Sequence, residues 1–163
     1  MATATWRHWG IAAAALLAAC NHASKPPILP PPQQVETGSR FNIRSPLTFP
    51  EGSSELLFQN ERLVTASNLS RDMPYCRLTR DSGAPGTVPE GRMTVGAVSY
   101  DTQAAGATGA MTAVTRIALV VDPGRPGYML SCGWPAGGSA RDFMSAEQIF
   151  NAIGGQFSMD LVR

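Results

Sequence analysis

Histidine and lysine are almost absent from this chain of 163 residues, and its larger C-terminal part has neither. The two histidines are His8 and His22, and the single lysine is Lys25, so residues 41–163 contain neither type. That part therefore lacks the base of Ser-His and Cys-His pairs, the amine of Schiff-base chemistry and imidazole zinc ligands. GxSxG, HExxH and phosphate-binding glycine motifs are missing as well. We expect a protein that is not an enzyme and that has no cofactor and no metal site.

A surplus of basic residues is also missing. Arg7 is one of the 13 basic residues, so 12 basic and 12 acidic residues follow it, and no basic arm is present. This balance argues against nucleic acid as a partner. The carboxylates could still supply an acid-base pair of the glycosidase kind. They are scattered along the chain and often lie beside arginines, so a carboxylate-dependent glycan-acting enzyme is the less favoured interpretation.

Long apolar runs are absent except for one short run near the start, over residues 10–19. Arg7 and His8 precede this run, and the pattern is typical of a secretory signal. The run is too short for a lasting transmembrane helix, which needs about 20 apolar residues. It ends in Leu17-Ala18-Ala19-Cys20, which resembles the lipobox of bacterial lipoproteins.

This resemblance implies that residues 1–19 are a signal peptide and that Cys20 carries covalently attached acyl chains. Each buried methylene contributes roughly 0.8 kcal/mol, so two or three chains give a lasting anchor where one would be marginal. Asn21 stands where an aspartate would signal retention at the inner membrane. The resemblance therefore implies a lipid-anchored protein of the cell envelope, at the outer membrane.

Two cysteines remain once Cys20 is assigned to lipid. Cys76 and Cys132 form an even pair, and neither belongs to a CxxC motif. The periplasm permits disulfides, so we predict a structural bridge between them rather than a redox-active pair.

The chain divides into a tether and one domain. Residues 20–40 are rich in proline, and we expect an extended tether in which Gln33, Gln34, Glu36 and Ser39 give nothing to pack. We expect residues 41–163 to form a single β-rich globular domain. Its expected fold is mainly β, a compact antiparallel sandwich or barrel-like domain with one short C-terminal helix followed by a final strand.

Strands are predicted where Val, Ile, Thr, Met and aromatic residues alternate between turn clusters, at residues 92–101, 111–121, 128–134 and 157–161. Met93, Val95 and Ala97 are expected on one face of the first strand. On the second strand the expected face is larger: Met111, Ala113, Thr115, Ile117, Leu119 and Val121.

Two shorter elements are less regular. Residues 54–65 fit a helix or a hairpin, and we favour a hairpin of strands 55–58 and 62–65 that turns near Asn60-Glu61. A helix should begin after Ser145, with Gln148 completing a capping box and Ile149, Phe150 and Ile153 as its apolar stripe. Gly154-Gly155 should end it.

One region offers a possible binding surface, an edge that could bind lipopolysaccharide phosphate or peptidoglycan carboxylate. Its residues are Arg71, Tyr75, Arg77 and Arg80, and Trp134 could serve as a recognition aromatic. Acidic residues among these arginines favour an ordinary solvated surface, and Trp134 is better explained as packing on the disulfide.

The function that fits these features is a non-catalytic binding or scaffolding module of the cell envelope. Its partners would be the membrane, through the lipid, and an envelope protein or peptidoglycan. The alternative is an inhibitor of a cell-wall-degrading enzyme such as lysozyme.

Overall fold

The computed structural model describes residues 33–70, 72–81, 86–102, 111–122, 125–135 and 142–162. Its elements, in chain order, are β1 (Arg40–Ile43), β2 (Leu47–Thr48), β3 (Glu55–Gln59), β4 (Arg62–Val64), η1 (Ala66–Asn68), β5 (Tyr75–Arg80), β6 (Thr87–Val88), β7 (Gly91–Thr102), β8 (Met111–Asp122), β9 (Arg125–Pro135), α1 (Ala146–Ile153) and β10 (Phe157–Asp160). The predicted strands, hairpin and helix are all present, within a few residues at each end.

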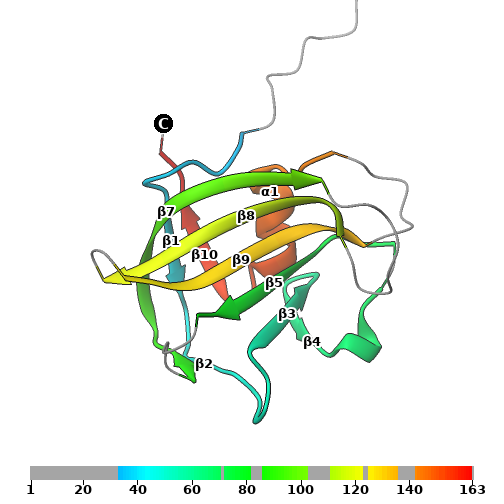
Figure 1. Cartoon of the computed structure of the whole chain (residues 1–163), viewed down its shortest axis with the longest axis horizontal. Helices are drawn as coiled ribbons and strands as arrows, with labels where there is room; N and C mark the ends of the chain where they lie inside the picture. The colour runs from blue at the N-terminus through cyan, green and yellow to red at the C-terminus, as the bar shows by residue number, and fades with distance from the viewer. Residues whose placement is uncertain are drawn as a thin grey trace, which may run out of the picture. The chain divides into compact units, whose positions relative to one another are not determined.

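Eight of the strands form one antiparallel sheet in the order β10-β1-β7-β8-β9-β5-β3-β4. The sheet curls into a half-barrel, with α1 on its concave side (Figure 1). β2 and β6 form a separate two-stranded ladder. The predicted fold class is therefore confirmed in its barrel-like form, as one curled sheet rather than two stacked ones.

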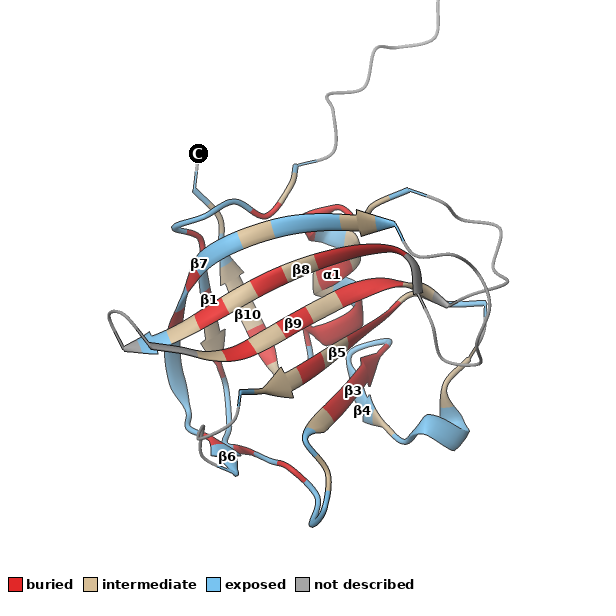
Figure 2. Cartoon of the chain, in the orientation of Figure 1, coloured by how far each residue is buried: buried red, intermediate tan, exposed pale blue. Residues whose placement is uncertain are grey.

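The main core lies on the concave face of this sheet, and the strands that cross it alternate buried and less buried residues (Figure 2). Phe157 of β10 meets Phe41 of β1 and Phe58 of β3 edge-on, with ring centroids 6.3 and 5.6 Å apart. β3 and β10 lie near opposite ends of the strand order. The aromatic contacts therefore join the two flanks of the half-barrel through its interior.

Helix α1 covers the concave side because one of its faces is apolar. A capping box fixes where the helix begins. Ile149 and Ile153 are completely buried, and the helix contacts β3, β5 and β10. The Ser145 Oγ accepts a hydrogen bond from the Gln148 amide at 3.3 Å, and the Gln148 side chain accepts one from the Ser145 amide at 2.8 Å. The predicted capping box is confirmed.

The hairpin preferred over a helix at residues 54–65 is also confirmed. β3 pairs with β4, and the two residues between them, Asn60 and Glu61, have φ angles of 50° and 63°. This is the left-handed geometry of a two-residue hairpin turn. The Glu61 amide donates to the carbonyls of Asn151 and Ala152 at the end of α1, at 3.1 and 3.0 Å. The turn is thereby fixed to the helix.

The predicted inner face of β7 is wrong at Ala97. The register of β7 against β8 shifts between Val95 and Ala97, so Gly96 is an additional residue in the ladder. Such a bulge reverses the alternation, which leaves Ala97 exposed and turns Val98 toward the main core. Val121, predicted to continue the inner face of β8, is 38% exposed because the ladder with β9 becomes irregular there.

The expectation that Gln33, Gln34, Glu36 and Ser39 give nothing to pack is wrong at Ser39. Val35 and Ser39 are 2% and 0% exposed, so this segment packs on the domain. The Gln33 carbonyl accepts a hydrogen bond from the Ala146 amide at 2.8 Å, which satisfies one of the free donors at the start of α1. This short segment can pack on the domain because the start of α1 supplies a hydrogen-bond partner for its backbone. The rest of the predicted tether, including Cys20, lies outside the described residues.

Candidate functional site

The predicted disulfide between Cys76 and Cys132 is confirmed. The two residues lie directly opposite each other on β5 and β9, with Cα atoms 4.1 Å apart. Both belong to the main core and are fully buried. Trp134, two residues further along β9, is half-buried and packs against this same core cluster. The bridge therefore ties two neighbouring strands together on their concave face.

The residues predicted as one binding surface are not brought together. Along β5 the residues alternate, so Tyr75 and Arg77 share the convex face while Arg80 has the opposite parity. Trp134 packs at the concave core, and Arg71 lies outside the described residues. Among the described members of this set, only Tyr75 and Arg77 are neighbours on one face.

Tyr75 and Arg77 belong to a small charged network on the convex face. The Arg77 Nε lies 3.2 Å from the Glu55 Oε2, and Tyr75 hydrogen-bonds to the Arg77 side chain. Burial raises the pKa of Tyr75 above its usual value, the Arg77 charge opposes this rise, and the Glu55 carboxylate adds to it. The charge of Arg77 is therefore balanced within the protein, which weakens the case for an anion site here.

Arg80 interacts with aromatic residues instead. Its guanidinium carbon lies 5.6 Å from the centroid of the Phe49 ring, and that ring stacks on Tyr128 at 6.2 Å. The Tyr128 hydroxyl donates to the Thr87 carbonyl at 3.4 Å. Burial raises the pKa of Tyr128, and the Arg80 charge opposes the rise. This arrangement is a packed cation-π stack, and it accounts for the position of Arg80 without a ligand.

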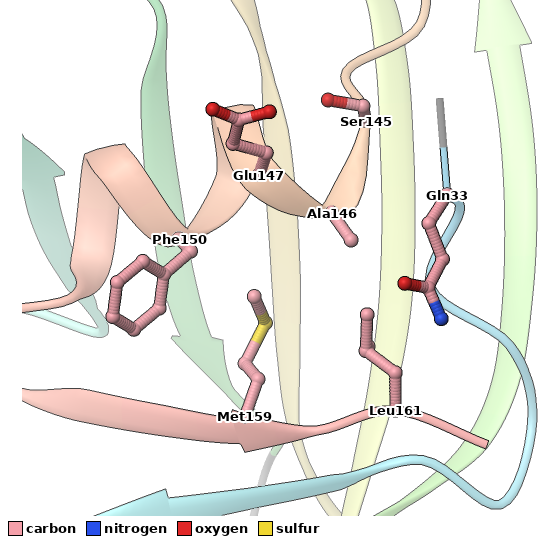
Figure 3. Close-up of a pocket in the computed structure, with 7 residues that line it drawn as sticks. All are labelled: Gln33, Ser145, Ala146, Glu147, Phe150, Met159 and Leu161. Carbon is pink, nitrogen blue, oxygen red and sulfur yellow. The ribbon is translucent and has the colours of Figure 1, made fainter. Parts of the chain in front are cut away.

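A cleft of about 400 Å³ lies between α1 and the end of β10 (Figure 3). Its walls are made by one face of the helix, the last strand and the N-terminal segment: Gln33, Ser145, Ala146, Glu147, Phe150, Met159 and Leu161. Figure 3 shows Met159 and Leu161 pointing toward the helix, with Ala146 pointing back toward them. The walls are mainly apolar, and the polar groups lie at the helix start. We refer to it as the α1–β10 cleft.

A second cleft, of about 520 Å³, lies at the opposite end of the sheet, where β4 stops and β3 continues. Among the described residues, Glu55 at the start of β3 has no strand partner on that side. Its amide donates to the Ser53 Oγ at 3.1 Å, and the Ser53 hydroxyl donates to its carbonyl at 2.9 Å. One side chain therefore satisfies both backbone groups that an additional strand would pair with.

The α1–β10 cleft is the candidate site that sequence reasoning missed. Phe150, Met159 and Leu161 were expected as members of apolar stripes, which they are, but all three are only half-buried. Periodicity identifies the face that a side chain occupies, whereas the order of strands in a sheet depends on long-range pairing. Nothing in the local pattern indicates that β10 is a terminal strand beside a helix.

The described residues contain no grouping of three or more His, Cys, Asp or Glu side chains placed to hold a metal ion. No helix in the part of the chain that the structure covers has the length and apolar character needed to span a bilayer. In comparisons with known proteins, the chain matches no protein-family model, no curated protein and no solved structure.

Proposed function

We propose that the protein is a lipid-anchored, non-catalytic binding or scaffolding module of a bacterial cell envelope. The observation that carries this proposal is the sequence Leu17-Ala18-Ala19-Cys20 at the end of a short apolar run. In a lipoprotein, Cys20 would become the first residue of the mature chain and would carry the acyl chains. Asn21 then favours the outer membrane as the destination.

Two features of the folded part support an envelope location and a binding role. The buried Cys76–Cys132 bridge fits a compartment that permits disulfides, because such bridges are rare in reducing cytosol. The domain also offers the α1–β10 cleft, whose apolar walls and polar rim suit a protein or peptide partner. Within this proposal, the lipid holds the domain at the membrane and the cleft contacts the partner.

The anchor is tested by metabolic labelling with tritiated palmitate in a Gram-negative host. We expect the wild-type protein to be labelled and to fractionate with the outer membrane. Cys20→Ser should abolish the label, since it removes the thiol that is acylated. Asn21→Asp is the matched control: it should keep the label and move the protein to the inner membrane. Equal labelling of wild type and Cys20→Ser would refute the anchor.

A further inference from the structure

Within the part of the chain that the structure describes, β10 is a terminal strand of the sheet and pairs only with β1. The Arg44 amide donates to the Gln156 carbonyl at 3.0 Å, which fixes which residues of this ladder form hydrogen-bonded pairs. In an antiparallel ladder, alternate residues direct their backbone groups to the same side. Met159 and Leu161 therefore direct their N–H and C=O groups away from β1. No hydrogen bond to these groups occurs among the described residues.

The open side of β10 borders the α1–β10 cleft, which its side chains help to line. Met159 and Leu161 line this cleft together with Ala146 and Phe150 of the helix (Figure 3). An added strand would continue the sheet about 4.8 Å from β10, on the side away from β1. Its backbone would meet the unpaired donors and acceptors of β10, and alternate side chains of the added strand would lie beside Met159 and Leu161 at the cleft.

The opposite edge of the sheet is less suited to a new strand. β4 has three residues, and only Leu63 directs its backbone groups outward, because Arg62 and Val64 pair with β3. Beyond β4, the backbone groups of Glu55 are already occupied by the Ser53 hydroxyl. β10 is therefore the more receptive of the two edges.

The charge at the α1–β10 cleft also limits which polypeptide segments would bind there. Among the residues that line the α1–β10 cleft, Glu147 is the charged one, and it is exposed. Gln33 and Ser145 supply the remaining polar groups of the rim. A complementary segment would carry apolar side chains at alternate positions and a basic residue near Glu147.

We propose that the α1–β10 cleft binds an extended segment of a partner polypeptide, which adds as a strand to the free edge of β10. This mode gives affinity through main-chain hydrogen bonds and selectivity through alternate side chains. The proposal rests on the binding role proposed above and names its site and ligand class.

The test uses the mature protein in detergent micelles and a defined peptide, acetyl-Arg-Val-Thr-Val-Thr-Val-amide. We expect a Kd of about 1 mM, because pairing with a short edge supplies few contacts. At saturating peptide, amide hydrogen exchange at Met159 and Leu161 should slow by about tenfold or more, while the Leu63 amide changes by less than about twofold. A peptide with Glu in place of Arg should bind more weakly.

Two proline variants provide a matched comparison, because proline removes one outward N–H and is tolerated at a strand edge. Met159→Pro should weaken peptide binding by about tenfold, whereas Leu63→Pro on the opposite edge should leave it within about twofold. The exchange measurement on the wild-type protein stands independently if Met159→Pro does not fold.

Three results would overturn the proposal: no protection of Met159 and Leu161 at millimolar peptide, protection at β4 instead, or protection of both amides before any peptide is added. The last result would mean that the edge is already covered, by this chain or by a second copy. Palmitate labelling is a separate measurement. A failed peptide test therefore does not refute the proposed lipid anchor, and a failed labelling test does not refute strand addition at β10.

Discussion

Reduction of the Cys76–Cys132 bridge should remove a large part of the stability of the domain. The cysteines are 56 positions apart in sequence, and the bridge links two strands that are already paired. For a closed loop of about 57 residues, the chain-entropy model gives about 14 cal/mol/K, or about 4 kcal/mol at 25 °C. Because domains are stable by about 5–15 kcal/mol, the loss would be a third or more of the total in most cases.

The magnitude translates into an observable shift in the melting temperature. The described residues span about 130 positions, and an unfolding entropy of about 2.1 cal/mol/K per residue gives about 270 cal/mol/K. A loss of about 4 kcal/mol then lowers the melting temperature by about 15 °C.

The assay compares oxidised protein with protein that was unfolded and refolded in reductant, by thermal and urea unfolding monitored by tryptophan fluorescence. Reduced protein keeps both sulfur atoms, so it isolates the effect of the covalent link from that of packing. The double variant Cys76→Ala/Cys132→Ala should lose at least as much, since it also removes buried atoms. A difference of less than about 1 kcal/mol between oxidised and reduced protein would refute the loop-entropy reasoning.

Two further predictions concern the hairpin joint and the convex face. Gly155→Ala should lower the free energy of unfolding by about 2 kcal/mol, because the added methyl group would overlap the carbonyl oxygen of Glu61. Gly127→Ala is the control: its methyl group makes an ordinary 3.7 Å contact, so the free energy of unfolding should change by less than about 0.5 kcal/mol. Equal melting temperatures of these two variants would contradict the close approach. The raised pKa of Tyr75 means that the unfolded chain loses this proton at lower pH than the native protein, so the free energy of unfolding should fall as pH rises above about 10. Urea titrations between about pH 9 and pH 11 should show a shallower fall in Tyr75→Phe, and an identical fall in both proteins would exclude Tyr75 as a source.

The elements that sequence analysis predicted correctly have local causes. The turn at Asn60-Glu61 follows from Asn60, which tolerates left-handed geometry, between two apolar pairs. The helix start follows from the Ser145 and Gln148 pair, which satisfies its own backbone donors. The disulfide was predictable because the lipobox resemblance assigns Cys20 elsewhere and leaves two cysteines.

The features that sequence analysis missed depend on long-range pairing. Gly96 gives no local sign of whether it is a bulge, since the extra residue exists only relative to β8. The placement of β1 between β10 and β7 joins segments that are about 50 or more residues apart, and no periodicity encodes it. The α1–β10 cleft is a consequence of that order. The burial of Val35 also has a long-range setting, since the Gln33 carbonyl two residues earlier accepts a hydrogen bond from the start of α1.

The Ser53 hydroxyl has a consequence for how the protein behaves in a crowded layer. Molecules confined to a membrane surface, as proposed here, meet far more often than the same number in solution. A bare end of β3 would let neighbouring copies stack into ribbons across that surface. By engaging both backbone groups of Glu55, one serine keeps that end unreceptive and so helps to keep neighbouring copies separate.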